Sequence, residues 1–301
     1  MSRMSLAILE EALPPSLTWR QKLDAAAKAG FDALELFISD DDSRAARLEM
    51  PYGMRRAVRD FQNDSGVRIG SISLSIPCSL LLASPNPAAR KRAIDILRGT
   101  VRFAENMGIN LIQLADCDMD TLDMTADGAK YFEESLRSAA LYAAASGVTV
   151  ALGTGKSPFM NTVSKAAEFV RRIGMPNFGL YPDIGNLYCG VEPPEGADAP
   201  GELARLVTAE LDSGRGHIFA AQLKDTRRDA HDGLFPGEGR VDFELIMAKL
   251  YELGVRRFAA VQRYTSDRAD CWEEDLKRTA SLMRGAWSKR KAGASHRANG
   301  D

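Results

Sequence analysis

Short apolar segments alternate along the chain with longer segments in which apolar residues recur every three or four positions. The short segments, which we predict to be strands, are residues 6–9, 33–39, 69–76, 111–115, 148–153, 178–183, 217–223 and 258–262. The longer segments include residues 19–30, 90–108 and 163–174, and each of these ends at a glycine. Apolar residues at this spacing, followed by a glycine, are typical of an amphipathic helix and its C-terminus.

Eight strands with intervening helices, no internal repeat and no long linker predict a single α/β domain, a (β/α)8 TIM barrel, over residues 1–288. A doubly wound open sheet is the competing architecture. It usually carries a glycine-rich phosphate turn after its first strand, and residues 9–15 (LEEALPP) contain none. Residues 190–202 form a Pro/Gly/acidic loop, either a lid or simply solvated. We expect residues 289–301, which are basic and rich in small residues, to be a disordered tail.

Composition and charge exclude several classes of function. The formal net charge of -2 argues against nucleic acid as a partner, because proteins that bind its backbone usually carry a basic excess. No run of about 18 apolar residues exists, so no membrane span is expected. The first residues turn acidic too soon for a signal peptide, and the four cysteines are widely spaced, so we expect a cytoplasmic protein with reduced thiols. Three histidines are too few for a multi-histidine metal site.

Polar residues stand at the ends of the predicted strands, which is where barrel enzymes carry their sites. They are Glu10, Glu35, Ser39, Ser73, Ser75, Asp116, Asp118, Gly153 with Lys156, Asp183, Asn186, Gln222, Lys224, Asp225, Gln262 and Arg263. Such a ring is polar enough to bind a sugar or polyol. It contains few carboxylates on neighbouring strands and no histidine.

Structural roles compete with functional ones at several of these positions. Asp116 and Asp118 could cap a helix, and Lys224 with Asp225 could pair with neighbouring strand ends. Glu35 lies between two leucines within a strand, so its carboxylate must point into the barrel or find a partner, because an unpaired buried charge is costly. Asp183 follows an apolar strand and precedes Ile-Gly-Asn, which favours a position at the barrel mouth.

Six short segments resemble, in order, those of one family of sugar-converting barrels. The segments are EALP (11–14), IQLA (112–115), FMNTVSKA (159–166), YPDIGN (181–186), LKDT (223–226) and GEGRVDF (237–243). The family is the L-ribulose-5-phosphate 3-epimerases, also known as hexulose-6-phosphate isomerases, of the xylose isomerase-like superfamily. The resemblance runs from Leu6 to the last predicted helix.

This resemblance implies metal-assisted epimerisation of a ketopentose phosphate. In the family, two glutamates, an aspartate and a histidine from the fifth to eighth strands hold a divalent cation such as Mn²⁺, Mg²⁺ or Zn²⁺. The cation polarises the C2 carbonyl, and the two glutamates exchange protons with opposite faces of the carbon.

The family ligands fall, in chain order, at Gly153, Asp183, Gln222 and Gln262. Three of the four ligands are therefore replaced, and both proton-transferring carboxylates are absent at Gly153 and Gln262. Glycine offers no side chain, and a glutamine oxygen is neutral and not basic. The sequence thus retains only Asp183 of the metal set and leaves the catalytic residues unassigned.

Two hypotheses follow from these replacements. In the first, the barrel mouth binds a sugar or polyol without a metal or other cofactor. In the second, an active epimerase or isomerase uses rearranged groups and a divalent metal, with Glu35, Asp116, Asp183 and Lys224 as the candidates. The substrate-binding residues that we predict are Glu35, Asp116, Asp183, Gln222, Lys224 and Gln262.

The expected partner is a small sugar or sugar phosphate, and a homodimer is compatible with such a barrel. Phosphate recognition is left open, since IPCSLLL (76–82) replaces the histidine and arginines of the family. A metal-dependent DNA-repair endonuclease shares the architecture, but its site needs several histidines around zinc ions, and we set it aside.

Overall fold

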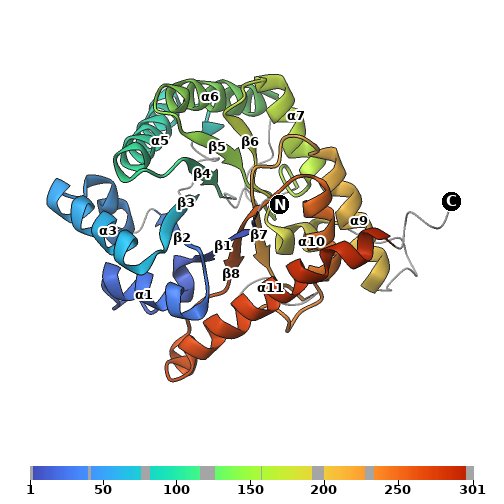
Figure 1. The fold of residues 1–301 in the computed structure, drawn as a ribbon. Coiled ribbons are helices and arrows are strands. Elements are labelled where there is room, and N and C mark those ends of the chain that lie inside the picture. The colour runs from blue at the N-terminus through green and yellow to red at the C-terminus, as the bar shows by residue number, and fades with distance from the viewer. Residues whose placement is uncertain are drawn as a thin grey trace.

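Eight parallel strands curl around a common axis in the computed structural model, which describes residues 3–39, 42–75, 82–115, 126–156, 158–191, 200–227 and 234–295 (Figure 1). The strands are β1 (Ser5–Leu9), β2 (Ala33–Ser39), β3 (Arg68–Ser75), β4 (Leu111–Leu114), β5 (Thr149–Leu152), β6 (Phe178–Leu180), β7 (Ala221–Lys224) and β8 (Arg257–Val261). Each lies within a segment predicted as a strand or extends it by one residue. The predicted (β/α)8 barrel is confirmed.

Helices alternate with the strands and surround the sheet (Figure 1). They are α1 (Trp19–Ala29), α2 (Asp42–Ala45), α3 (Tyr52–Ser65), α5 (Pro87–Met107), α6 (Ala126–Ala145), α7 (Val163–Ile173), α8 (Ile184–Gly190), α9 (Pro200–Ser213), α10 (Phe243–Glu252) and α11 (Trp272–Ser295). Three short 3₁₀ segments are also present, η1 (Glu10–Ala12), η2 (Ala46–Glu49) and η3 (Ser266–Arg268). The glycines predicted to end α1 and α5 do so in the left-handed conformation, with φ of 93° at Gly30 and 73° at Gly108.

The barrel closes between β6 and β7. The other neighbours pair in the order β6-β5-β4-β3-β2-β1-β8-β7, all parallel. Isolated parallel bridges at Leu180–Ile218 and Asp183–Gln222 join the two edges. At this seam the Phe219 ring packs so closely on the Gly179 backbone that a Cβ there would collide with it. Closure sets Asp183 and Gln222 side by side.

Apolar side chains of the strands fill the layer between sheet and helices, where Leu6, Ile8, Leu34 and Leu36 have no exposed surface. A second buried cluster combines alanines from five strands or their approaches with one aromatic ring. Its members are Ala7, Ala33, Leu111, Ala151, Tyr181, Ala220 and Ala259. We infer that the small alanine side chains leave room for the Tyr181 ring inside the barrel.

The last helix continues beyond the predicted domain boundary. Residue 288 lies inside α11, which ends at Ser295, and the domain boundary placed there stays a prediction. Lys289 Nζ lies 2.6 Å from Glu244 Oε1, and the Arg290 guanidinium stacks 4.2 Å from the Trp287 ring centroid. Residues 296–301 lie outside the described residues.

Across the described part of the chain, no helix has the length and apolar character needed to span a membrane.

Candidate functional site

A polar cavity of about 190 Å³ opens at the carboxyl ends of the strands, where the sequence placed the site. Its lining includes Ser73, Gln113, Asp183, Gln222, Lys224 and Gln262. Six of the eight strands contribute to the lining, and the loops after β5 and β6 contribute as well, so the cavity lies on the barrel axis.

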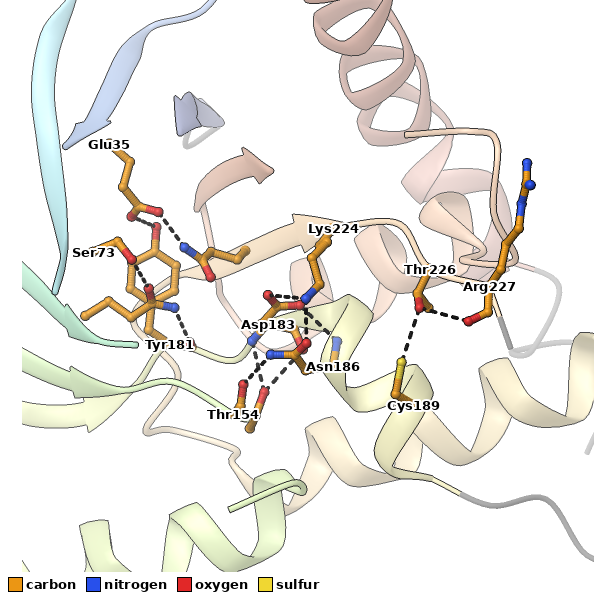
Figure 2. Close-up of polar contacts among 12 residues, drawn as sticks. Glu35, Ser73, Thr154, Tyr181, Asp183, Asn186, Cys189, Lys224, Thr226 and Arg227 are labelled. Atoms are coloured by element: carbon orange, nitrogen blue, oxygen red, sulfur yellow. Dashed lines mark hydrogen bonds and ion pairs between the residues drawn. The ribbon is translucent and has the colours of Figure 1, made fainter. Parts of the chain in front are cut away.

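Lys224 places its ammonium group beside Asp183 and Asn186, as Figure 2 shows. Its Nζ lies 3.5 Å from Asp183 Oδ2 and donates a hydrogen bond of 2.5 Å to Asn186 Oδ1. The Lys224 and Asp183 residues are 9% and 7% exposed, so this ion pair is almost completely removed from water. In a buried ion pair of this kind, each charge is compensated by its partner, and removing one partner leaves the other uncompensated.

The second oxygen of Asp183 caps a helix. Asp183 Oδ1 accepts a hydrogen bond of 3.0 Å from the Asn186 backbone N–H at the start of α8, which is the usual role of an N-cap aspartate. The backbone N–H of Asp183 donates to Thr154 Oγ1, and Asn186 Nδ2 donates to the Thr154 carbonyl. These bonds tie the end of β6 to the loop after β5, so both carboxylate oxygens of Asp183 are engaged in a fixed network.

Glu35 lies completely buried beneath this cavity and does not line it. Its Oε2 accepts hydrogen bonds from the Tyr181 hydroxyl (2.6 Å) and the Ser71 hydroxyl (2.7 Å), and its Oε1 accepts one from Gln222 Nε2 (2.7 Å). Burial raises the pKa of the Glu35 carboxyl, and the hydrogen bonds from Tyr181, Ser71 and Gln222 oppose that rise. β2 carries Glu35 below the mouth, where it contacts Gln222, and its predicted contact with a substrate stays a prediction.

At the other two positions of the family's metal ligands, the Gln262 side chain is hydrogen-bonded and Gly153 has no side chain. Gln262 Oε1 accepts a hydrogen bond of 2.5 Å from the Thr279 hydroxyl of α11. A Cβ added at Gly153 would lie 3.0 Å from the Leu114 carbonyl oxygen and 3.4 Å from Gln113 Nε2. Gln113 in turn donates to the Tyr181 carbonyl and accepts from Ser73. A larger side chain at position 153 would therefore require its neighbours to move.

These four positions do not fit the divalent cation that the family resemblance implies. Hard cations such as Mg²⁺ and Mn²⁺ prefer several charged oxygen ligands. Here Asp183 is the one carboxylate, it already pairs with the Lys224 ammonium, and the Gln262 oxygen accepts from a hydroxyl. Within the described ranges, no group of three or more His, Cys, Asp or Glu side chains could hold a metal ion.

Lys224 and Asp225, adjacent in sequence, have separate roles. Lys224 pairs across the seam with the end of β6, one of the alternatives that the sequence left open. Asp225 is 1% exposed, and its carboxylate accepts backbone hydrogen bonds from Gly237 (2.8 Å), Gly239 (2.9 Å) and Val241 (3.2 Å). It therefore holds the loop before α10.

Part of the predicted site lies outside the described residues. This applies to Asp116 and Asp118, to most of the 190–202 loop and to residues 76–81 of the segment that replaces the family's phosphate ligands. Of the six predicted substrate-binding residues, the structure brings Asp183, Gln222, Lys224 and Gln262 together around the cavity. Glu35 touches this group only through Gln222.

Sequence reasoning missed Tyr181, Ser71 and Gln113 as members of the buried polar network. Gln113 is the one polar residue of an otherwise apolar strand, which is the signal that singled out Glu35, whereas Ser71 is one of several serines in its strand. Tyr181 gave no such signal, because a tyrosine after an apolar strand also suits the core. Its partner Glu35 is 146 residues away in sequence.

Comparison with known proteins shows the family of the chain. A family model described as xylose isomerase-like TIM barrel matches residues 23–284. L-ribulose-5-phosphate 3-epimerase UlaE of Escherichia coli (strain SMS-3-5 / SECEC) is 33% identical over 252 residues, covering 84% of this chain and 84% of that protein. The protein of the same name from Shigella boydii serotype 18 is 32% identical, with the same coverage.

Solved structures of sugar epimerases share the fold. An L-ribulose 3-epimerase superposes with a TM-score of 0.77 at 19% identity, covering 98% of this chain and 97% of that one. D-psicose 3-epimerase from Clostridium cellulolyticum H10 superposes with a TM-score of 0.75 at 16% identity, covering 94% and 99%. The chain belongs to the xylose isomerase-like TIM barrel family, and within it to the family of the L-ribulose-5-phosphate 3-epimerases.

Proposed function

We propose that this member of a sugar epimerase family binds a sugar or polyol in its barrel mouth without a divalent metal, and that it lacks the metal-dependent epimerisation implied by the resemblance. The observation that carries the proposal is the Lys224 ammonium, 3.5 Å from Asp183 Oδ2, at the one family ligand position that keeps a carboxylate. A neighbouring positive charge disfavours a second cation. The amides of Gln222 and Gln262 supply hydrogen bonds without charge.

The chemistry of the cavity suits hydroxyl groups. The amides can donate and accept, the ammonium donates, and Ser73 lines the same cavity. The names of the relatives point the same way, since L-ribulose, D-psicose and L-ribulose 5-phosphate appear in them. Neutral ketoses and their reduced polyols are therefore the first ligands to test, with L-ribulose 5-phosphate beside them.

The test combines metal content with ligand binding. Purified protein is assayed for bound Mn, Mg and Zn, and thermal melting is followed during a Mn²⁺ titration and, separately, during titration with L-ribulose, ribitol and L-ribulose 5-phosphate. We expect no stoichiometric metal, no shift at micromolar Mn²⁺, and a higher Tm with a neutral sugar or polyol. UlaE from Escherichia coli, handled in parallel, is the comparison protein.

Two outcomes would contradict the proposal. Stoichiometric metal, or a melting shift at micromolar Mn²⁺, would mean that other groups complete a metal site. Turnover of L-ribulose 5-phosphate that survives a chelator would instead favour an active isomerase built on rearranged groups, with Lys224 and Asp183 as its first candidates.

A further inference from the structure

Glu35 offers Gln222 an acceptor and no donor. The hydroxyls of Tyr181 and Ser71 both reach Glu35 Oε2, at 2.6 and 2.7 Å, which leaves Oε1 to Gln222 (Figure 2 shows Glu35 and Tyr181). Arg257 adds a favourable charge nearby. Burial raises the pKa of Glu35, whereas the hydrogen bonds from Tyr181, Ser71 and Gln222 and the charge of Arg257 favour its ionised form. An ionised carboxylate can only accept hydrogen bonds, so the Gln222 amide turns its NH₂ group toward it.

This contact determines what Gln222 presents to the cavity. The residue is 6% exposed and lines the mouth, and its Nε2 is engaged at 2.7 Å by the buried Glu35. Among the residues that the structure describes, Gln222 Oε1 has no hydrogen-bond partner. The amide oxygen is therefore the polar atom that Gln222 offers to a ligand.

We propose that Glu35 is a positioning residue that fixes the Gln222 amide with its oxygen toward the cavity, so that position 222 accepts a hydrogen bond and favours a ligand with a hydroxyl group there. This inference rests on the proposed function, because it assumes that the mouth binds a hydroxylated ligand. A ligand that places only a carbonyl or phosphate oxygen at position 222 would bring a second hydrogen-bond acceptor against the Gln222 oxygen. The lone pairs of the two oxygens would repel each other.

Gln262 provides the contrast. Its partner is the Thr279 hydroxyl, which can either donate or accept, so Thr279 does not dictate the orientation of that amide. The partner of Gln222 therefore determines which end of its amide faces the cavity, whereas the partner of Gln262 does not.

Glu35→Gln tests the inference directly. The hydroxyls of Tyr181 and Ser71 keep their acceptor only if the new amide turns its oxygen to them. Its NH₂ group then faces Gln222, which can remain paired only by turning its own oxygen inward and its NH₂ group to the cavity. The variant should therefore invert the hydrogen-bonding polarity at position 222 while leaving each partner satisfied.

The assay is the NMR spectrum of the glutamine side-chain amides. The chain has five glutamines, Gln21, Gln62, Gln113, Gln222 and Gln262, so selective ¹⁵N labelling gives few signals. Gln222→Met assigns the pair of interest. In the wild type we expect the Gln222 NH₂ protons to exchange slowly with water, and in Glu35→Gln we expect their shifts to change and their exchange to accelerate at least tenfold. Thr279→Val is the matched control and should perturb Gln262 and leave Gln222 unchanged.

Fast exchange of the Gln222 NH₂ group in the wild type would overturn the inference, and this result does not depend on whether Glu35→Gln folds. An unchanged Gln222 signal in folded Glu35→Gln would also overturn it. Because both readouts are free of ligand, they are separate from the proposed function.

The ligand arm uses L-ribulose and calorimetry. We expect Glu35→Gln to bind L-ribulose about tenfold more weakly than the wild type, which is the usual effect of one unmade hydrogen bond, whereas Thr279→Val retains the preference at position 222. Equal affinity in the wild type and in Glu35→Gln, with an inverted Gln222, would overturn the hydroxyl preference. If the wild type binds neither L-ribulose nor ribitol, the proposed function fails and the hydroxyl preference falls with it, while the amide spectrum still decides the positioning role of Glu35.

Discussion

Replacing Lys224 by methionine removes the ammonium group that lies between Asp183 and Asn186 and keeps most of the side-chain volume. Asp183 then retains one hydrogen bond, from the Asn186 backbone N–H, and loses the countercharge 3.5 Å from its Oδ2. Both residues of the pair are less than a tenth exposed, so water can reach Asp183 only from the cavity that the pair lines and replaces the lost partner poorly. We expect a clear loss of stability.

The magnitude follows from the burial of the pair. Removing one partner of a buried ion pair typically costs about 3–5 kcal/mol, because the other charge stays uncompensated. An unfolding entropy of about 2 cal/mol/K per residue, applied to 301 residues, converts this into a fall in Tm of roughly 5–8 °C. Lys91→Met is the matched control, since Lys91 pairs with Asp95 at 2.7 Å with both side chains exposed, and it should change the free energy of unfolding by less than about 0.5 kcal/mol.

The assay is thermal and urea unfolding of wild type, Lys224→Met, Asp183→Asn and the double variant. The double variant contains no buried unpaired charge at this point, and asparagine can still cap α8. It should therefore be more stable than Lys224→Met alone, which gives a coupling energy of about 1–3 kcal/mol. A Lys224→Met variant that melts within 1 °C of the wild type, or a double variant no more stable than Lys224→Met, would refute the reasoning.

Two further predictions concern the support of the site. Gly239→Ala places a Cβ against the Asp225 carboxylate and should cost about 1–3 kcal/mol, measured by urea unfolding, and a variant as stable as wild type would contradict this. Burial alone would raise the pKa of Glu10, but Arg47 and Lys22 hold it below its ordinary value of 4.5. A lowered pKa stabilises the fold above that value, and the stabilisation is lost as the pH falls through the lowered pKa. The Tm should thus fall less between pH 7 and pH 3 in Glu10→Gln than in wild type. Equal falls in Tm would contradict the stabilising role of the ionised Glu10.

The sequence by itself determined the barrel. Apolar runs such as residues 33–39 are strands because they can be buried on both faces, and the intervening segments are helices because their apolar residues fall on one side. These signals are local, so they survive without knowledge of neighbours. Sequence also placed polar residues at the strand ends, and most of the predicted substrate-binding set lies around one cavity.

The hydrogen-bond partners were decided only by tertiary structure. Glu35 contacts Tyr181 and Gln222, which are 146 and 187 residues away, and Lys224 reaches Asn186 across the seam between β7 and β6. No local pattern encodes such pairs, because they depend on strand register and on barrel closure. A buried carboxylate takes whichever donors the closed barrel brings to it, and for Glu35 these are Tyr181, Ser71 and Gln222.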